Sequence, residues 1–172
     1  TRYASLDQID ASNFSMLEVA WRFKTDNLGP AREFNFQSTP LVVGGVLYST
    51  AGSRRAVVAL DARTGELLWM HRYEEGERGL DAPRRLSGRG LAYWTDGREE
   101  RIVYVTPGYR MIALDARTGV PIPGFGTGGV VALKLEAGQD MNLITGDLGL
   151  HAAPVIARIA KLDGRLNAVV TP

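Results

Sequence analysis

The chain of 172 residues contains no cysteine, and this absence excludes disulfide bonds and thiolate metal sites. It does not distinguish a periplasmic protein from a cytoplasmic one. No apolar run approaches the ~20 residues that a transmembrane helix requires. Residues 1–5 lack a charged segment followed by an apolar one, so we expect that any targeting segment has been removed or lies outside this chain.

An excess of charge of either sign is also absent. The sequence has 20 lysines and arginines against 19 aspartates and glutamates, which gives a formal net charge of +1. Binding to nucleic acid or to an anionic membrane ordinarily requires a strongly basic face. We therefore expect no nucleic-acid partner, and the hydrophobic content of 45% is ordinary for a globular protein.

The most informative feature that is present is a repeat of seven residues. Ala-Leu-Asp-Ala-Arg-Thr-Gly occurs at residues 59–65 and again at 113–119, so the copies start 54 residues apart (113 − 59). Each copy begins within a short apolar run that is typical of a buried strand. The Asp, Thr and Gly favour a tight turn after it. This spacing is typical of a repeated supersecondary unit, and we predict that the unit is the blade of a β-propeller.

The residues around the repeat predict two blades. After the first copy, a strand at residues 66–70 contains Trp69, whose indole is expected to dock on a neighbouring blade. Two strands around a Gly-Gly turn precede it, so the first blade is predicted at about 37–70. After the second copy Pro121 and Pro123 replace the strand, so we expect a short or edge hairpin in a second blade at about 90–125.

The segment before the blades is predicted to have little regular structure. Residues 5–20 carry capping residues and irregular apolar spacing, which indicate a short helix or turns. Residues 21–25 alternate large apolar with polar residues, as a half-buried strand does. A formal G-x-G-x-x-G at residues 124–129 does not predict nucleotide binding, because prolines precede it and a strand-like run, not a helix, follows.

The spacing Ala-x-Asp-x-x-Thr-Gly-x-x-x-Trp resembles the tryptophan-docking repeat of the quinoprotein dehydrogenases, bacterial enzymes that use pyrroloquinoline quinone (PQQ). Residues 6–25, 89–94 and 119–131 are similar to other segments of the same family. The resemblance covers about residues 6–157 and implies an all-β fold with part of an eight-bladed propeller. Since a complete propeller needs more residues, we predict that the chain is part of a larger molecule.

This resemblance implies a three-part organisation of the chain. Residues 1–36 would form a lead-in segment and a first outer strand. Residues 37–157 would form two blades and the start of a third. Residues 158–172 depart from the family and are expected to be a divergent or truncated tail.

The loop at residues 74–90 is rich in charge. Its glutamates, Glu74, Glu75 and Glu77, are expected to be solvated. Arg89 differs because glycines flank it on both sides, so that the backbone can approach a bound group while the guanidinium offers a bidentate fork to a carboxylate or quinone oxygen. The resemblance implies that Arg89 contacts PQQ. The alternative is a structural arginine that pairs with a carboxylate of another blade.

Two further arginines lie just before this position. In the alcohol dehydrogenase branch of the family, an adjacent-cysteine disulfide there covers one face of the quinone. In this chain the neighbourhood holds Arg84 and Arg85, so the disulfide is absent. Either arginine could cover that face instead, which favours the branch that oxidises glucose or polyols.

Two polar residues stand three positions before a proline and an apolar pair, where the resemblance implies that side chains face the central cofactor. They are Gln37, where relatives often carry Glu, and His151, where relatives often carry Ser or Thr. For His151 a surface or structural imidazole is the alternative.

The family oxidises an alcohol or sugar hydroxyl. A carboxylate general base removes the hydroxyl proton, hydride passes to the quinone, and a calcium ion polarises the quinone oxygen. None of the base, metal ligands and cofactor-stacking tryptophan of the family matches a residue here, so the isolated chain is expected to be inactive. The resemblance also implies a cytochrome or quinone as electron acceptor and a periplasmic location. The alternative is a non-catalytic propeller scaffold that binds proteins, which would not need the arginine-rich loop.

Overall fold

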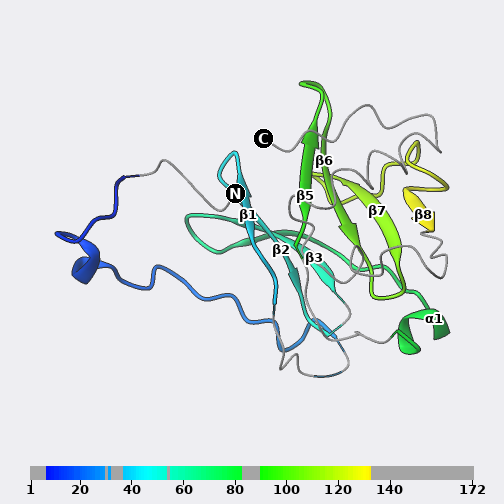
Figure 1. The fold of residues 1–172 in the computed structure, drawn as a ribbon, viewed down its shortest axis with the longest axis horizontal. Helices are drawn as coiled ribbons and strands as arrows, with labels where there is room; N and C mark the ends of the chain where they lie inside the picture. Colours follow the sequence, from blue (N-terminus) through cyan, green and yellow to red (C-terminus); the bar gives the residue numbers. More distant parts are fainter. Residues whose placement is uncertain (1–6, 30, 32–36, 54, 83–89, 133–172) are drawn as a thin grey trace, which may run out of the picture.

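The computed structural model describes residues 7–29, 31, 37–53, 55–82 and 90–132. These residues form two antiparallel four-stranded sheets, each with its strands in chain order (Figure 1). The first sheet consists of β1 (Leu41–Val43), β2 (Val46–Ala51), β3 (Ala56–Asp61) and β4 (Leu67–His71). The second consists of β5 (Ala92–Thr95), β6 (Glu100–Val105), β7 (Arg110–Asp115) and β8 (Val130–Ala132). The predicted all-β fold with two successive blades is confirmed.

The first sheet forms where the sequence predicts it. A two-residue turn joins β1 to β2, and both of its residues, Gly44 and Gly45, have positive φ, as tight hairpin turns require. The outer strand β4 pairs with β3, with a register shift between Ala59 and Leu60. The sheet therefore ends at His71, one residue beyond the predicted blade.

The second sheet extends further along the chain than predicted. The prediction ended this blade near residue 125, but β8 pairs with β7 as a fourth strand. Pro121 makes only an isolated bridge with Leu114. Since proline has no N–H to donate, the chain leaves the sheet there and returns after a turn in which Gly126 and Gly129 have positive φ. The strand-like run after these glycines thus belongs to the second blade.

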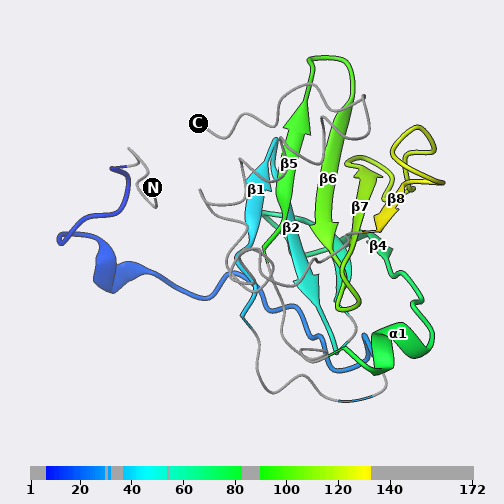
Figure 2. The ribbon, with the colours of Figure 1, turned by 45° about the vertical axis from the view of Figure 1, so that its right-hand side comes forward.

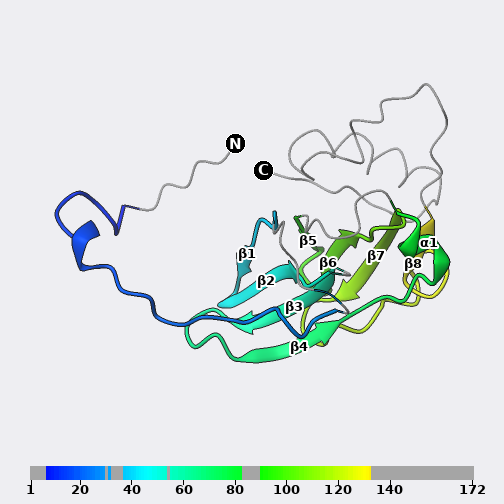
Figure 3. The ribbon, with the colours of Figure 1, turned by 90° about the horizontal axis from the view of Figure 1, so that it is seen from below.

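The segment before the first sheet contains one 3-10 turn, η1 (Phe14–Met16), as predicted. The predicted strand at residues 21–25 is wrong, because the segment pairs with no strand in the described part of the chain. Its side chains nevertheless alternate between half-buried and exposed. Trp21 and Phe23 pack against Val58 and Leu60 of β3, and Figure 3 shows the segment running alongside the first sheet.

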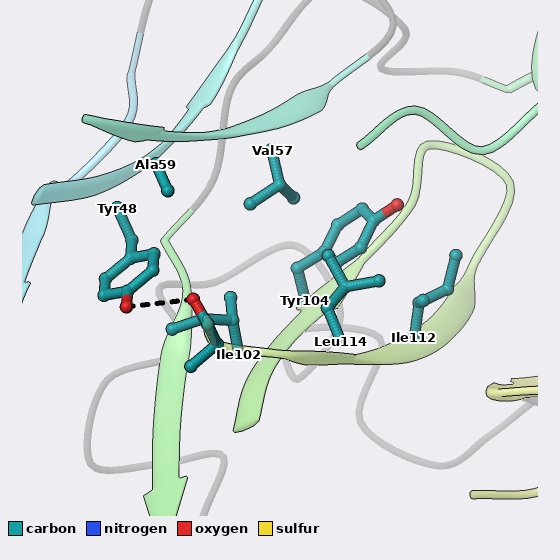
Figure 4. Close-up of a cluster of buried hydrophobic side chains, with 8 residues drawn as sticks. Tyr48, Val57, Ala59, Ile102, Tyr104, Ile112 and Leu114 are labelled. Carbon is teal, nitrogen blue, oxygen red and sulfur yellow. Dashed lines mark hydrogen bonds between the residues drawn. The ribbon is translucent and has the colours of Figure 1, made fainter. Parts of the chain in front are cut away.

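The main hydrophobic core lies between the two sheets, which Figures 2 and 3 show side by side. Strands of both sheets contribute to it (Figure 4). Its buried side chains are Tyr48, Val57, Ala59, Ile102, Tyr104, Ile112, Leu114 and Ala116. Strand β3 is buried on both faces, since alternate residues point to this core and to the segment before the sheet. This explains why β3 reads as a continuous apolar run.

The predicted docking of Trp69 on the neighbouring blade is confirmed. Its indole N–H donates a 2.9 Å hydrogen bond to the carbonyl oxygen of Ala116, in the second copy of the repeat. The ring lies against Gly119, where φ is 71° and an added Cβ would stand 2.5 Å from the indole. Glycine is therefore required at this position by both backbone and space.

Trp21 repeats this geometry on the first copy of the repeat. Its indole N–H donates a 3.1 Å hydrogen bond to the carbonyl oxygen of Ala62, and its ring lies against Gly65. Each copy is thus a docking site for a tryptophan that precedes it in the chain. Within the described residues, no helix is long and apolar enough to cross a membrane.

Candidate functional site

The repeats lie at one edge of the sheets, and Gln37, the candidate cofactor residue that the structure describes, lies at the opposite edge. Both copies of the repeat form the turns that leave β3 and β7. The other edge, here called the loop edge, has five parts. It is formed by residues 37–40 before β1, residues 52, 53 and 55 between β2 and β3, the segment 72–82 after β4, residues 90–91 before β5, and the turn at 106–109.

Gln37, one of the predicted cofactor contacts, lies exposed on the loop edge. The next residue, Ser38, anchors it to the end of β2. The hydroxyl of Ser38 accepts a 2.9 Å hydrogen bond from the hydroxyl of Thr50 and lies 2.9 Å from that of Ser49. These buried partners hold the start of the first blade while leaving Gln37 towards solvent.

The two blade entrances meet on this edge. An ideal Cβ built on Gly90 would lie 4.0 Å from the Cβ of Thr39. The residue that follows Arg89 is therefore adjacent to the segment that begins with Gln37. Leu91 continues the contact by packing against the core between the sheets.

The other predicted site residues cannot be placed in the same way. Arg84, Arg85, Arg89 and His151 lie outside the described residues. Their roles stay predictions that follow from the resemblance.

The expectation that Glu75 is solvated is wrong. One of its carboxylate oxygens accepts a 2.5 Å hydrogen bond from the hydroxyl of Thr106, and the other accepts a 2.8 Å bond from the N–H of Gly108. Both donors belong to the turn between β6 and β7. Glu74 is exposed, as expected, and forms a 2.9 Å ion pair with Arg72.

Two arginines also link the segment after β4 to the second sheet. The Nε of Arg78 donates a 2.5 Å hydrogen bond to the carbonyl oxygen of Gly108. Arg110, at the start of β7, donates a 3.2 Å bond to the hydroxyl of Tyr73, and its guanidinium lies 5.6 Å from the centre of that ring. The same segment contains a single helical turn, α1 (Glu77–Leu80), where the sequence predicts a loop.

Three buried polar atoms near this edge have no hydrogen-bond partner among the described residues: Nε2 of His71, the hydroxyl oxygen of Tyr104 and Nε of Arg110. The rings of His71 and Tyr104 meet edge to face at 6.3 Å. Burial lowers the pKa of the His71 imidazole. Burial, and then the charge of Glu75, raises the pKa of the Tyr104 hydroxyl, so both side chains are neutral at physiological pH.

Sequence reasoning missed the role of Glu75, Thr106 and Arg110. Their contacts join residues 31 to 37 positions apart, and no local pattern marks such pairs. The predicted turn at Pro107 and Gly108 was the available signal, because a turn offers backbone groups that a nearby charged side chain can bond.

The loop edge offers one exposed side-chain donor, Gln37, among the candidate residues that the structure describes. The described residues contain no group of three or more His, Cys, Asp or Glu side chains gathered to hold a metal. The exposed amide of Gln37 can donate to a carboxylate or quinone oxygen, which are the polar groups of PQQ.

Comparison with known proteins identifies the family. Residues 1–161 match the β-propeller domain of the PQQ family described as glucose/ethanol/alcohol dehydrogenase. The chain belongs to this family. The resemblance inferred from the tryptophan-docking repeat is therefore confirmed, and PQQ is the family's cofactor.

Relatives in the PQQ dehydrogenase family are much longer than this chain. The dehydrogenase subunit of alcohol dehydrogenase (quinone) from Gluconobacter oxydans is 39% identical over 69% of the chain and 14% of that protein. The glycerol dehydrogenase large subunit from Gluconobacter thailandicus is 30% identical over 96% of the chain and 24% of that protein. The chain thus spans a quarter or less of these curated relatives.

Solved structures of the family share the fold. The quinohemoprotein alcohol dehydrogenase from Comamonas testosteroni matches with a TM-score of 0.54 and 34% identity, over 69% of this chain and 16% of that one. A europium-containing methanol dehydrogenase matches with a TM-score of 0.54 and 31% identity, over 69% of this chain and 20% of that one.

Proposed function

We propose that the chain is part of a PQQ-dependent dehydrogenase that oxidises an alcohol or a sugar, and that it supplies two blades and part of the cofactor-binding edge. The observation that carries this proposal is the family match over residues 1–161. The loop edge supports it, because the contact between Gly90 and Thr39 brings together the two segments that lead to Arg89 and Gln37.

Within this proposal the side chains of the loop edge bind and orient PQQ. When bound, PQQ supplies a quinone that takes up the hydride from the substrate. Arg89 binds a carboxylate or quinone oxygen through two parallel N–H groups, and Gln37 donates from its amide. Arg84 or Arg85 covers one face of the ring system. His151 faces the cofactor from the next blade entrance.

A sugar or polyol is the favoured substrate. Arg84 and Arg85 stand where the alcohol dehydrogenase branch has its cysteine pair. The relative that covers 96% of the chain is named a glycerol dehydrogenase subunit. The alternative substrate is a simple alcohol, because other relatives are named alcohol dehydrogenases.

The electron acceptor is proposed to be a cytochrome or a quinone, in the periplasm. Two relatives support such acceptors, since one is named an alcohol dehydrogenase (quinone) and the other a quinohemoprotein alcohol dehydrogenase. A calcium ion would be held by residues of other blades.

Dye reduction tests the proposal in two forms of the protein. The whole dehydrogenase that contains this chain should reduce an artificial electron acceptor when supplied with PQQ, calcium and glucose or glycerol. The purified 172-residue chain should not, because base and metal ligands are proposed to lie elsewhere. Turnover by the chain alone would refute the second expectation. Absence of turnover and of PQQ binding in the whole protein would favour a scaffold.

A further inference from the structure

We propose that Glu75 and Arg78 are positioning residues for PQQ binding. Both side chains hydrogen-bond Gly108 in the β6–β7 turn, and these bonds fix the segment that leads to the candidate arginines. This inference rests on the proposed function, because it assigns those residues a role in binding the same cofactor.

The grip is made on one glycine. Glu75 accepts a hydrogen bond from the N–H of Gly108 at 2.8 Å, while Arg78 donates to its carbonyl oxygen at 2.5 Å. Both backbone polar groups of Gly108 are thus bonded by side chains three residues apart. We call the arrangement of Glu75, Arg78 and Gly108 the Gly108 clamp.

The clamp leaves no room for a side chain at its centre. A Cβ on Gly108 would lie 2.6 Å from a carboxylate oxygen of Glu75 and 3.0 Å from Cγ of Arg78. Real Cβ atoms do not come as close as 2.6 Å to another atom, so an alanine at this position would displace the carboxylate of Glu75. Glycine at this turn is therefore explained by the clamp.

Thr106 strengthens the clamp from the same turn. Its hydroxyl donates to Glu75 at 2.5 Å and accepts a 3.0 Å bond from the N–H of Arg110. Hydrogen bonds to an ionised carboxylate are roughly twice as strong as neutral ones. Glu75 therefore ties the segment after β4 to two residues of the turn, Thr106 and Gly108.

The segment needs this anchor because its own structure is weak. The helix α1 has four residues, and a helix of one turn is not stable in isolation. The other fixed points are Tyr73, which packs on the core, and Ala82, which is buried. Seven residues separate Ala82 from Gly90, which lies beside Thr39. The clamp therefore fixes the chain a few residues before the candidate arginines.

The positioning role is tested in the whole dehydrogenase with the variants Glu75→Gln and Gly108→Ala. Glu77→Gln is the matched control, because Glu77 is exposed and its side chain makes no hydrogen bond or ion pair among the described residues. Gly124→Ala controls for the added methyl group, since nothing lies within 4 Å of its Cβ position. Three quantities are measured: the melting temperature, the rate of trypsin cleavage within residues 72–89, and the Kd of PQQ in the presence of calcium.

The expected result is faster cleavage and a Kd for PQQ about ten-fold higher in both clamp variants, because binding would have to order the segment first. The controls should behave like wild type, and the melting temperature of Glu75→Gln should stay close to it. Unchanged cleavage in Glu75→Gln would overturn the clamp. Faster cleavage with an unchanged Kd would overturn its role in PQQ binding.

The proposed function can fail separately. If Arg89→Ala binds PQQ as tightly as wild type, the role of Arg89 is wrong, whereas the clamp is still judged by the cleavage rates. If the wild-type protein binds no PQQ, the proposed function and the positioning role are both overturned.

Discussion

The indole N–H of Trp69 donates a 2.9 Å hydrogen bond to the carbonyl oxygen of Ala116, across the interface between the two sheets. The same oxygen accepts a 3.1 Å bond from the buried hydroxyl of Tyr48. Two side chains of the first blade therefore converge on one backbone acceptor of the second. The repeat that contains Ala116 holds the blades together, and Gln37, the candidate cofactor contact that the structure describes, lies on the opposite edge.

Gly119→Ala should destabilise the chain clearly more than the same change at a glycine that also has positive φ but has open space around it. The change costs about 1 kcal/mol for the left-handed backbone and about 1–3 kcal/mol more for overpacking, since the new Cβ would meet the ring of Trp69. Gly97→Ala is the control, because its φ is also positive but nothing lies within 4 Å. Chemical denaturation should show a clearly larger loss for Gly119→Ala, and equal losses would contradict the docking geometry.

The two buried tyrosines of the core should respond differently to loss of the hydroxyl. Tyr48→Phe should lower the free energy of unfolding by about 1 kcal/mol, because it removes the bond to Ala116. Tyr104→Phe should be neutral or slightly stabilising, because its hydroxyl has no partner among the described residues. Urea titrations of both variants decide this. A comparable loss in Tyr104→Phe would mean that its hydroxyl is satisfied, for example by ordered water.

His71 should make the chain less stable in mild acid. Its pKa is lowered by burial in the folded state, so the unfolded chain binds a proton at a higher pH than the folded chain does. The contribution of neutral His71 to the free energy of unfolding is complete above the ordinary histidine pKa of 6.5. It is lost as the pH falls from 6.5 towards the lowered pKa of His71 in the folded chain. His71→Phe should reduce this slope in melting experiments between pH 7 and 5. His151→Gln is the control, and an unchanged slope in His71→Phe would contradict the assignment.

Local patterns were sufficient for most of the fold. The apolar runs, the glycine turns and the repeated Asp-Ala-Arg-Thr-Gly predicted both sheets, because each depends on residues close in sequence. The docking of Trp69 joins residues 47 positions apart, and it was predicted from the repeat and not from a local pattern. The strand β8 was predicted to lie outside the second blade, because Pro121 and Pro123 indicated that the chain leaves the sheet. No sequence pattern indicated that the chain returns to pair with β7. The segment at residues 21–25 has the alternation of a strand but lacks a partner in the described part of the chain, and a partner cannot be read from alternation.

The candidate site was less predictable. Gln37 was assigned to the cofactor by resemblance; it lies exposed on the loop edge, and its contact with PQQ stays a prediction. Glu75 was expected in solvent because charged loops usually are, yet it bonds a turn more than 30 residues away. Only the packing of the two sheets brings that turn within its reach.

The Kd of PQQ for the whole dehydrogenase, compared between wild type, Arg89→Lys and Arg89→Ala, is the most direct measurement of the central claim that the loop edge binds the cofactor. Loss of the bidentate fork should weaken binding about ten-fold or more in Arg89→Lys, and further in Arg89→Ala. Equal Kd values in all three proteins would contradict the claim.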